Sequence, residues 1–429
     1  MRMIHRLLTP LGIACLAAGA LLTGGCTGYR PDPPNLQGNA AEWRELSLAL
    51  VPPGKSVSWE HMRDIGLLLN PDLNKARLKC LSSQAAARYA GLWEDPSLSL
   101  DAARYLKGLQ YDRSAGLGLS IPVSGRTGIE RKVAELYSTA DRLELLAQEN
   151  AYLMRLRSLY FFIRIAHTKL NLIHSRLKQA SEEKENILRL CDLGEAGAAD
   201  RHAAAQRHND LIKELQELEN AHLNKHLELL NLLGLHPSVG EVEIAGALPE
   251  GVPSPVELPS ESKLMAHPRL QAALCTYQTS EEELRLQIRK QYPDLSLTPG
   301  LSHEEGDNKF ALEVGFTLPL WNRNREAIAR AESNRTMNKQ NAVDTWHELL
   351  SQAHALGHRQ KLARQHCRNE YERLAALRET AAQQEQLFEL GELDLPTLAA
   401  TRHETYARRL AYLDCLAELL EIQVALQYL

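Results

Sequence analysis

Two pairs of histidines have a spacing that could bind a metal ion. His222 and His226, like His354 and His358, are four residues apart, so on a helix the two imidazoles of a pair share one face. His347 lies seven residues before His354 on a similar face. No cysteine or carboxylate clearly completes either pair in the sequence. Solvated polar stripes on water-facing helices are therefore the favoured interpretation and no metal site is predicted, while weak sites for a metal in transit stay open.

Other chemistry is not indicated by the sequence. It contains no nucleotide-binding loop of the Gly-x-x-x-x-Gly-Lys type and no metalloprotease motif. No nucleophile, base and orienting group can be assembled, so we predict no enzyme, no catalytic residue and no cofactor. With 49 basic and 54 acidic residues the chain is slightly acidic. This charge argues against a nucleic-acid-binding surface.

The first 25 residues are typical of a secretory signal peptide. Arg2 and Arg6 precede an apolar run over 7–22, and small residues follow it. The run is short and is interrupted by Pro10, which disfavours a membrane-spanning helix. Removing residues 1–25 takes away two arginines and no acids, so the formal charge changes from −5 to −7.

Cys26 follows the small residues and is the predicted lipidation site. The residues before it resemble a bacterial lipobox, in which the cysteine thiol is acylated. Leu22 lies four residues before the cysteine, whereas a lipobox usually has leucine three before it, where Thr23 stands here. Cleavage near Gly25 with an incidental cysteine is the alternative.

The next segment, residues 26–58, is rich in Pro, Gly and Asn, and we expect it to be an extended tether. The remaining cysteines have no close pair and are odd in number, so they indicate neither a disulfide framework nor a metal knuckle. We expect them to be buried apolar side chains: Cys80, Cys191, Cys275, Cys367 and Cys415.

Short motifs recur 197 residues apart without any net insertion. Asn70-Pro71-Asp72-Leu73 corresponds to His267-Pro268-Arg269-Leu270, and Leu193-Gly194-Glu195 corresponds to Leu390-Gly391-Glu392. Two further motif pairs have the same register, Asp95–Leu100 with Tyr292–Leu297 and Gly118–Pro122 with Gly315–Pro319. The chain therefore reads as a tandem duplication.

Each copy contains a long stretch with almost no helix breaker. We predict long helices over about 126–192 and 323–389, each followed by a return helix, over 198–233 and 396–428. Apolar residues recur every three or four positions, which indicates coiled-coil packing. Because only a short turn separates each long helix from its return helix, each pair should form an antiparallel hairpin.

Each copy also contains two stretches in which apolar residues alternate with small or polar ones. They predict strands over about 95–106 and 115–122 in the first copy, and over 292–302 and 310–319 in the second. Prolines mark the strand–helix junctions, at Pro96, Pro122, Pro293 and Pro319. The length and alternation suit an outer-membrane β-barrel. A half-buried soluble sheet would show the same alternation.

Four strands are too few to close a barrel, because bacterial barrels begin at about eight strands. An unclosed edge in lipid would leave backbone groups without partners, at a cost of several kcal/mol for each group. Several chains must therefore join if the strands enter a membrane.

The order helix, strand, strand, long helix, turn and helix, present twice in an exported chain, resembles the TolC family of outer-membrane efflux proteins. The specific motifs are the run from Thr317 to Arg325, which leads from the last strand into the long helix, and Leu390-Gly391-Glu392. That run most resembles members that serve heavy-metal efflux pumps. The resemblance covers residue 59 onward, as repeats over 59–255 and 256–429.

The resemblance implies a mainly α fold with a small β part. It also implies a homotrimer with a twelve-strand β-barrel in the outer membrane and a twelve-helix α-barrel in the periplasm. The expected function is a passive exit duct of a tripartite efflux pump or a type I secretion system. Its expected partners are outer-membrane lipid, a periplasmic adaptor and an inner-membrane pump of RND type, and no nucleic acid.

The resemblance places partner binding at the hairpin tips, where five residues are candidates: Gly194, Glu195, Gly391, Glu392 and Asp394. The tube of this family narrows just past the second tip, and the matching positions here are Thr397 and Ala400 instead of acids. Glu392, Asp394 or Glu404 could supply that charge.

Two other functions compete with the duct. A periplasmic adaptor is also exported and helical, but it would carry one hairpin within a lipoyl-like domain instead of a whole unit repeated twice. A structural coiled-coil lipoprotein gives no reason for four matched strands. The transported substrate cannot be read from the sequence.

Overall fold

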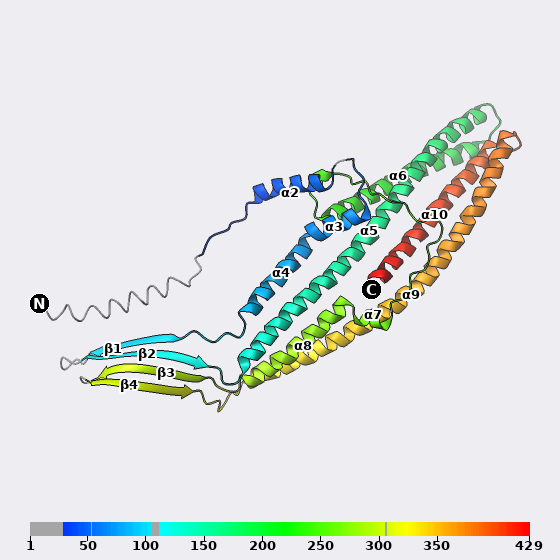
Figure 1. Cartoon of the computed structure of the whole chain (residues 1–429). Helices are drawn as coiled ribbons and strands as arrows, with labels where there is room; N and C mark the ends of the chain where they lie inside the picture. The colour runs from blue at the N-terminus through cyan, green and yellow to red at the C-terminus, as the bar shows by residue number, and fades with distance from the viewer. Residues whose placement is uncertain (1–28, 53, 105–110, 305–306) are drawn as a thin grey trace. The chain divides into compact units, whose positions relative to one another are not determined.

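The computed structural model describes residues 29–52, 54–104, 111–304 and 307–429 (Figure 1). The signal peptide and Cys26 lie outside the described residues. The chain divides into two compact units, Met1–Leu46 and Ser47–Leu429, and the second holds nearly all of the fold.

The order of elements in the second unit repeats itself. Two shorter helices lead into a strand pair, then a long helix and its return helix, and the same sequence of elements follows again. The helices of the first series are α3 (Trp59–Leu69), α4 (Pro71–Arg88), α5 (Arg126–Asp192) and α6 (Ala198–Leu233). After a short 3-10 helix, η1 (Pro237–Val239), the second series comprises α7 (Glu261–Met265), α8 (Pro268–Arg289), α9 (Arg325–Glu389) and α10 (Leu395–Tyr428).

The recurring motifs have the same local role in both series. Asn70 caps α4 by accepting hydrogen bonds from the backbone N–H groups of Asp72 and Leu73, and Pro71 is the first helical residue. His267 caps α8 in the same way through Nδ1, which accepts from the Arg269 N–H at 3.2 Å. Asn70 and His267 are different residue types, but both can accept a hydrogen bond from the helix backbone. Each can therefore occupy the same position of the 197-residue repeat.

The strands form one antiparallel sheet in the order β1-β2-β3-β4. Its members are β1 (Ser97–Arg104), β2 (Tyr111–Ile121), β3 (Leu295–Glu304) and β4 (Asp307–Phe316). The two hairpins join where β2 pairs with β3, with Ala115 opposite Leu301 and Leu119 opposite Leu297. The sheet thus unites strands from both series, and it lies at one end of the second unit (Figure 1).

The long helices pack against one another in pairs and across the two series. α5, which at about 1.5 Å per residue spans roughly 100 Å, contacts α4, α6, α8 and α10. α9 packs along α8 and α10. The ends of α5 and α9 that lie farthest from the sheet meet their return helices at two turns (Figure 1).

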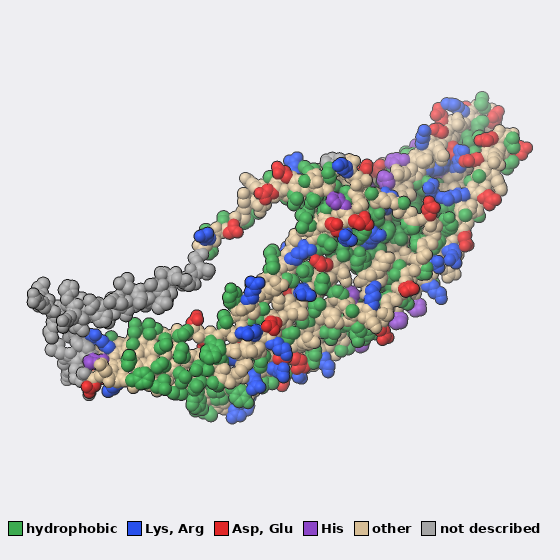
Figure 2. Space-filling view, in the orientation of Figure 1, with side chains coloured by type: hydrophobic (Ala, Val, Ile, Leu, Met, Phe, Trp, Pro, Cys, Tyr) green, Lys and Arg blue, Asp and Glu red, His purple; other side chains and the backbone are tan. Residues whose placement is uncertain are grey.

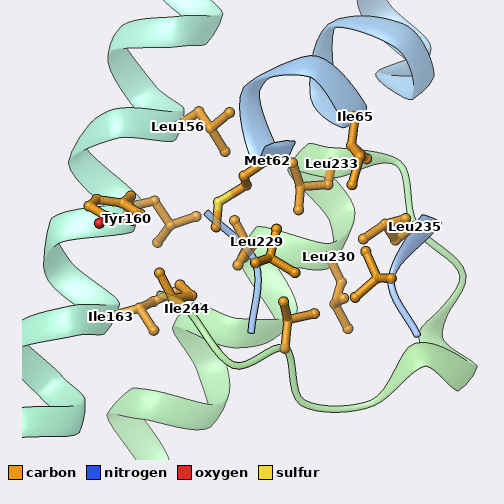
Figure 3. Close-up of a cluster of buried hydrophobic side chains, with 14 of the residues drawn as sticks. Met62, Ile65, Leu156, Tyr160, Ile163, Leu229, Leu230, Leu233, Leu235 and Ile244 are labelled. Carbon is orange, nitrogen blue, oxygen red and sulfur yellow. The ribbon is translucent and has the colours of Figure 1, made fainter. Parts of the chain in front are cut away.

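The largest core lies where α3 crosses α5 and α6 (Figure 3). Met62, Leu156 and Leu229 are each 0% exposed there. The segment after η1 closes this core because Ile244 forms a bridge with Val57. Burial of such side chains contributes about 1.5–3 kcal/mol each.

A second core joins α5, α9 and α10. Cys367 and Leu419 are fully buried in it, and the amide of Gln360 exchanges two hydrogen bonds with the backbone of Val256. Four of the five expected apolar cysteines are buried and free, and the fifth, Cys191, is half-buried.

Several predicted bounds differ from the structure. The segment 26–58 is not extended throughout, because α2 (Leu36–Leu50) is a helix. β2 begins at Tyr111, earlier than predicted, and residues 105 and 106 of the first predicted strand lie outside the described residues. α9 begins at Arg325 instead of residue 323, because Arg323 and Asn324 adopt left-handed backbone angles that a helix does not allow.

Candidate functional site

One face of the sheet is apolar and uncovered. The side chains that alternate onto it lie opposite one another across the strands, as Leu297 does to Val314 and Leu301 to Phe310. Leu100 and Phe310 are each 71% exposed, so no helix covers them. Figure 2 shows the hydrophobic surface that results over the strands. The further exposed members are Leu98, Leu117, Leu301, Leu312, Val314 and Phe316.

The other face of the sheet is lined by small and polar residues. Serines lie opposite glycines, as in the pairs Ser99–Gly116 and Ser296–Gly315. The Ser296 hydroxyl donates to the Gly315 carbonyl at 2.9 Å, and a Cβ on Gly315 would lie 2.7 Å from that hydroxyl. A larger residue at this position would therefore require the Ser296 hydroxyl to move. An uncovered apolar face opposite a face of small and polar residues is the pattern of strands in a water-filled membrane β-barrel.

The outer strands of the sheet have unpaired edges. Among the described residues, β1 pairs only with β2, and β4 pairs only with β3. Each outer strand therefore presents backbone N–H and C=O groups that a further strand could pair with. No helix among the described residues is long and apolar enough to cross a membrane.

The strand–helix junctions contain the four predicted prolines. Pro96 and Pro122 flank the first strand pair directly, whereas Pro293 and Pro319 lie two or three residues outside the second. An unpredicted residue, Arg126, fixes this region. Its Nη2 lies 2.7 Å from Asp294 and 3.3 Å from Glu94, so the first residue of α5 is tied to the approaches of β1 and β3.

The two tips have the same backbone geometry. Gly194 and Gly391 have φ angles of 79° and 75°. In each tip the N–H after the glycine bonds to a carbonyl five residues earlier: Glu195 to Leu190 at 2.9 Å, and Glu392 to Leu387 at 2.9 Å. These are Schellman caps, in which a glycine in the left-handed region ends the helix.

The tips also carry exposed apolar residues that were not singled out from the sequence. Leu193 and Leu390 occupy equivalent positions just before the glycines, and they are 74% and 73% exposed. Glu195, Glu392 and Asp394 are exposed beside them. Each tip therefore combines one apolar side chain with acidic neighbours. The motif Leu-Gly-Glu, recognised as a repeat, contained this signal.

A pocket of about 710 Å³ lies between the tips and receives residues from both turns, including Glu195 and Asp394. Glu183 lines this pocket, and Arg176 of α5, which is 3% exposed, makes two hydrogen bonds to it, at 3.0 and 2.9 Å. Arg402 of α10 bonds to Glu183 at 3.2 Å and to Glu385 of α9 at 3.2 Å. These four side chains join the two hairpins, and sequence spacing gave no sign of them.

On α10 near the tips, burial favours the uncharged forms of His403 and Tyr406. Burial, followed by the charges of Arg176 and Arg207, lowers the pKa of His403. Burial and the neighbouring Glu214 raise the pKa of Tyr406, whose hydroxyl donates to Glu214 at 2.9 Å. Thr397, Ala400 and Glu404 are exposed on α10.

The two histidine pairs have different environments in the structure. His354, His358 and His347 are exposed on α9, in agreement with a solvated stripe. The prediction is wrong for the other pair, because His226 is only 4% exposed. The statement that no carboxylate completes this pair is also wrong, since Glu241 from the segment after η1 lies beside it, with an oxygen 3.7 Å from His222 Nδ1.

The fold is that of outer-membrane channels. The chain matches CusC, whose structures concern transmembrane channel formation, with a TM-score of 0.71 over 88% of this chain and 96% of CusC at 16% identity. It matches the CmeC outer-membrane channel of Campylobacter jejuni with a TM-score of 0.72, over 94% of this chain and 90% of CmeC at 15% identity. The outer-membrane protein VceC of Vibrio cholerae gives a TM-score of 0.68, with 86% and 94% covered at 15% identity. No protein-family model and no curated protein matches the sequence.

Proposed function

We propose that this chain is a TolC-family channel, the outer-membrane exit duct of a tripartite efflux pump or of a type I secretion system, and that it performs no chemical reaction itself. One observation carries the proposal: a four-stranded sheet with an uncovered apolar face and two unpaired edges, attached to helices far longer than a domain. The fold shared with outer-membrane channels supports it. A structural coiled-coil lipoprotein would leave this sheet without a purpose.

The duct forms from three copies of the chain. The unpaired edges of β1 and β4 can pair between neighbouring copies, so three sheets of four strands close a barrel of twelve. The helices of three chains then continue the barrel as a tube. The recurring series of elements, in one 197-residue register, supports a tandem duplication that gives the tube its approximate sixfold arrangement.

The N-terminus anchors the duct to the membrane. Cleavage after residue 25 would make an acylated Cys26 the N-terminal residue, and residues 26–58 would connect the lipid to the fold. A lipid anchor on each chain adds to the membrane attachment of the strands. Mass spectrometry of the mature protein should find the acyl groups on Cys26.

The tips dock on a periplasmic adaptor, which connects the duct to an inner-membrane pump of RND type. The paired exposed leucines and acidic residues of the tips support this role. Leu193→Glu together with Leu390→Glu should reduce adaptor cross-linking at the tips without disturbing the trimer. Equal cross-linking in this double variant would contradict docking at the tips.

Opening of the duct separates the hairpins at their tips. The Arg176–Glu183–Arg402–Glu385 cluster holds the hairpins together in the present arrangement. A rigid-body shift of the packed helices would have to break its bonds between α5 and α10.

The decisive experiment is biochemical. The mature protein should be found in outer-membrane fractions and should run as a trimer that dissociates on heating. Recovery of a stable, water-soluble monomer without detergent would overturn the proposal, because such a monomer would hide its apolar sheet face by some other means.

A further inference from the structure

We propose that His222, His226 and Glu241 form a binding site for a divalent transition-metal ion such as Zn²⁺, with water completing its coordination. The site is independent of the duct function. It lies on α6 and the segment that follows η1, away from the sheet and the tips.

The three side chains converge from two elements. One ligand atom of each lies within 4.8 Å of the other two. The imidazoles of His222 and His226 are 5.9 Å apart between ring centroids, one turn apart on α6. Tetrahedral zinc with bonds of about 2.0–2.1 Å needs ligand atoms about 3.3 Å apart. The pair formed by His222 and Glu241, at 3.7 Å, already approaches this separation.

His226 is the least exposed of the three residues, and one of its ring nitrogens has no hydrogen-bond partner. His226 is 4% exposed, and its Nε2 accepts the backbone N–H of Val242 at 2.6 Å. Its Nδ1 is buried without a hydrogen-bond partner. A buried ring nitrogen without a partner is costly, and a metal site is one reason for a protein to keep it.

The remaining ligands can adjust to an ion. The Glu241 side chain is 70% exposed and free to move by the short distance that coordination needs, while the His222 side chain is 12% exposed. Coordination through His226 Nε2 would replace the Val242 hydrogen bond, and coordination through Nδ1 would move the ring proton to Nε2, which could then no longer accept the Val242 N–H. Either way, an imidazole–imidazole–carboxylate set suits zinc and its neighbours better than Ca²⁺ or Mg²⁺.

The ion would join α6 to a segment that already contributes to the largest core. Val57 donates to the Glu243 carbonyl at 2.7 Å and accepts from the Ala245 N–H at 2.9 Å, on either side of Ile244. A ligand that binds only the folded state stabilises it. Zn²⁺ should therefore raise the unfolding temperature of the protein.

The test is calorimetric titration of the metal-stripped mature protein in detergent with Zn²⁺. His222→Gln and Glu241→Gln should each lower the affinity by at least about tenfold, since even residues that only support metal ligands contribute 10–100-fold. Both variants should also lose the zinc-dependent rise in unfolding temperature. His226 is left intact because it supports the Val242 backbone.

The matched control is the double variant His354→Gln and His358→Gln, which removes the exposed pair of the same spacing on α9. It should bind Zn²⁺ at the proposed site as the unaltered protein does. Unchanged affinity in Glu241→Gln and His222→Gln would overturn the site. An equal loss in the control would overturn it as well, because it would place the binding on surface histidines in general.

Discussion

The sheet and the helices of Ser47–Leu429 differ in what covers their apolar side chains. In the helical part, Met62 and Leu156 are 0% exposed, whereas Leu100 and Phe310 of the sheet are 71% exposed. The core residues of the helical part, such as Met62 and Leu156, are covered by other segments of the same chain. The sheet leaves its apolar face to its surroundings, which must therefore be apolar. The helical part is therefore suited to water, and the apolar face of the sheet is suited to an apolar medium.

The polar groups of the two regions differ in the same sense. The helical part buries charge: Arg176 and Glu183 are 3% and 6% exposed and bond to each other. The polar face of the sheet instead carries small residues whose hydroxyls bond to neighbouring backbone, as Ser99 does to the Gly116 carbonyl at 3.3 Å. Substitutions in the helices should therefore act by removing the partners of buried groups. Substitutions in the sheet should act through the contact of the new side chain with the surrounding medium.

The largest effect is expected where the helical part buries charge. Arg176→Ala leaves Glu183 buried with only Arg402 beside it, and breaking a buried pair in this way costs about 3–5 kcal/mol. We expect a loss near 3 kcal/mol because Arg402 remains. Chemical unfolding in detergent, followed by circular dichroism of the helices, measures it.

The matched control for this prediction is Arg189→Ala. Arg189 pairs with Glu185 on the same helix at 2.6 Å, but both side chains are more than 60% exposed. Removing an exposed pair of this spacing costs only about 0.3–0.5 kcal/mol. Similar losses in the two variants would mean that burial does not set the strength of the Arg176 pair.

The second effect distinguishes the two faces of the sheet. Leu312→Arg places a charge on the apolar face, and Glu313→Arg places the same side chain on the opposite face of the same strand. In a membrane the first should cost about 2–4 kcal/mol near the middle of the bilayer, and the second should cost little. Heat-induced dissociation of the proposed trimer in lipid measures both. An equal response would mean that the apolar face does not contact lipid.

A smaller effect is expected at the tips. Gly391→Ala forces an alanine into the left-handed region at φ 75°, with no atom within 4 Å of the new Cβ, so only backbone strain of about 1 kcal/mol opposes it. Gly128→Ala in α5 also meets no atom, but its backbone is helical, so it should stabilise the protein by about 0.5 kcal/mol. Opposite signs in thermal unfolding would confirm that the tip glycine acts as a cap.

The sequence predicted the helices better than the strands, for a physical reason. α5 and α6 begin and end where predicted because glycines bracket them, at Gly125, Gly197 and Gly234 among others. An alternating pattern shows which residues share a face, but it does not show where hydrogen bonding between strands stops. The bounds of the strands therefore shifted by up to four residues.

The sites made by distant residues could not be predicted. Arg402 lies 219 residues after Glu183, and no periodicity connects them. Glu241 lies in a segment without regular structure, 15 residues after His226, so helical spacing could not associate the two. Helix α2 was missed because the composition of the whole segment 26–58 outweighed its own residues, which contain no proline between Leu36 and Leu50. In the first two cases a contact between distant residues formed the site, and in the third the residues of the helix differ from the composition of the segment around them.

The smallest effect separates the buried histidine of the helical part from the exposed ones. Because burial lowers the pKa of His226, the unfolded chain binds a proton at a higher pH than the folded chain does. The free energy of unfolding should therefore fall as the pH drops below about 6.5, the ordinary value for histidine, and level off below the folded-state pKa. Glutamine can still accept the Val242 N–H, so His226→Gln should reduce this pH dependence without removing the hydrogen bond. Denaturant unfolding between pH 7.5 and 5 measures the difference, with His354→Gln at an exposed histidine as the control. If the free energy of unfolding depends on pH equally in His226→Gln and in the unaltered protein, burial of this ring does not influence stability.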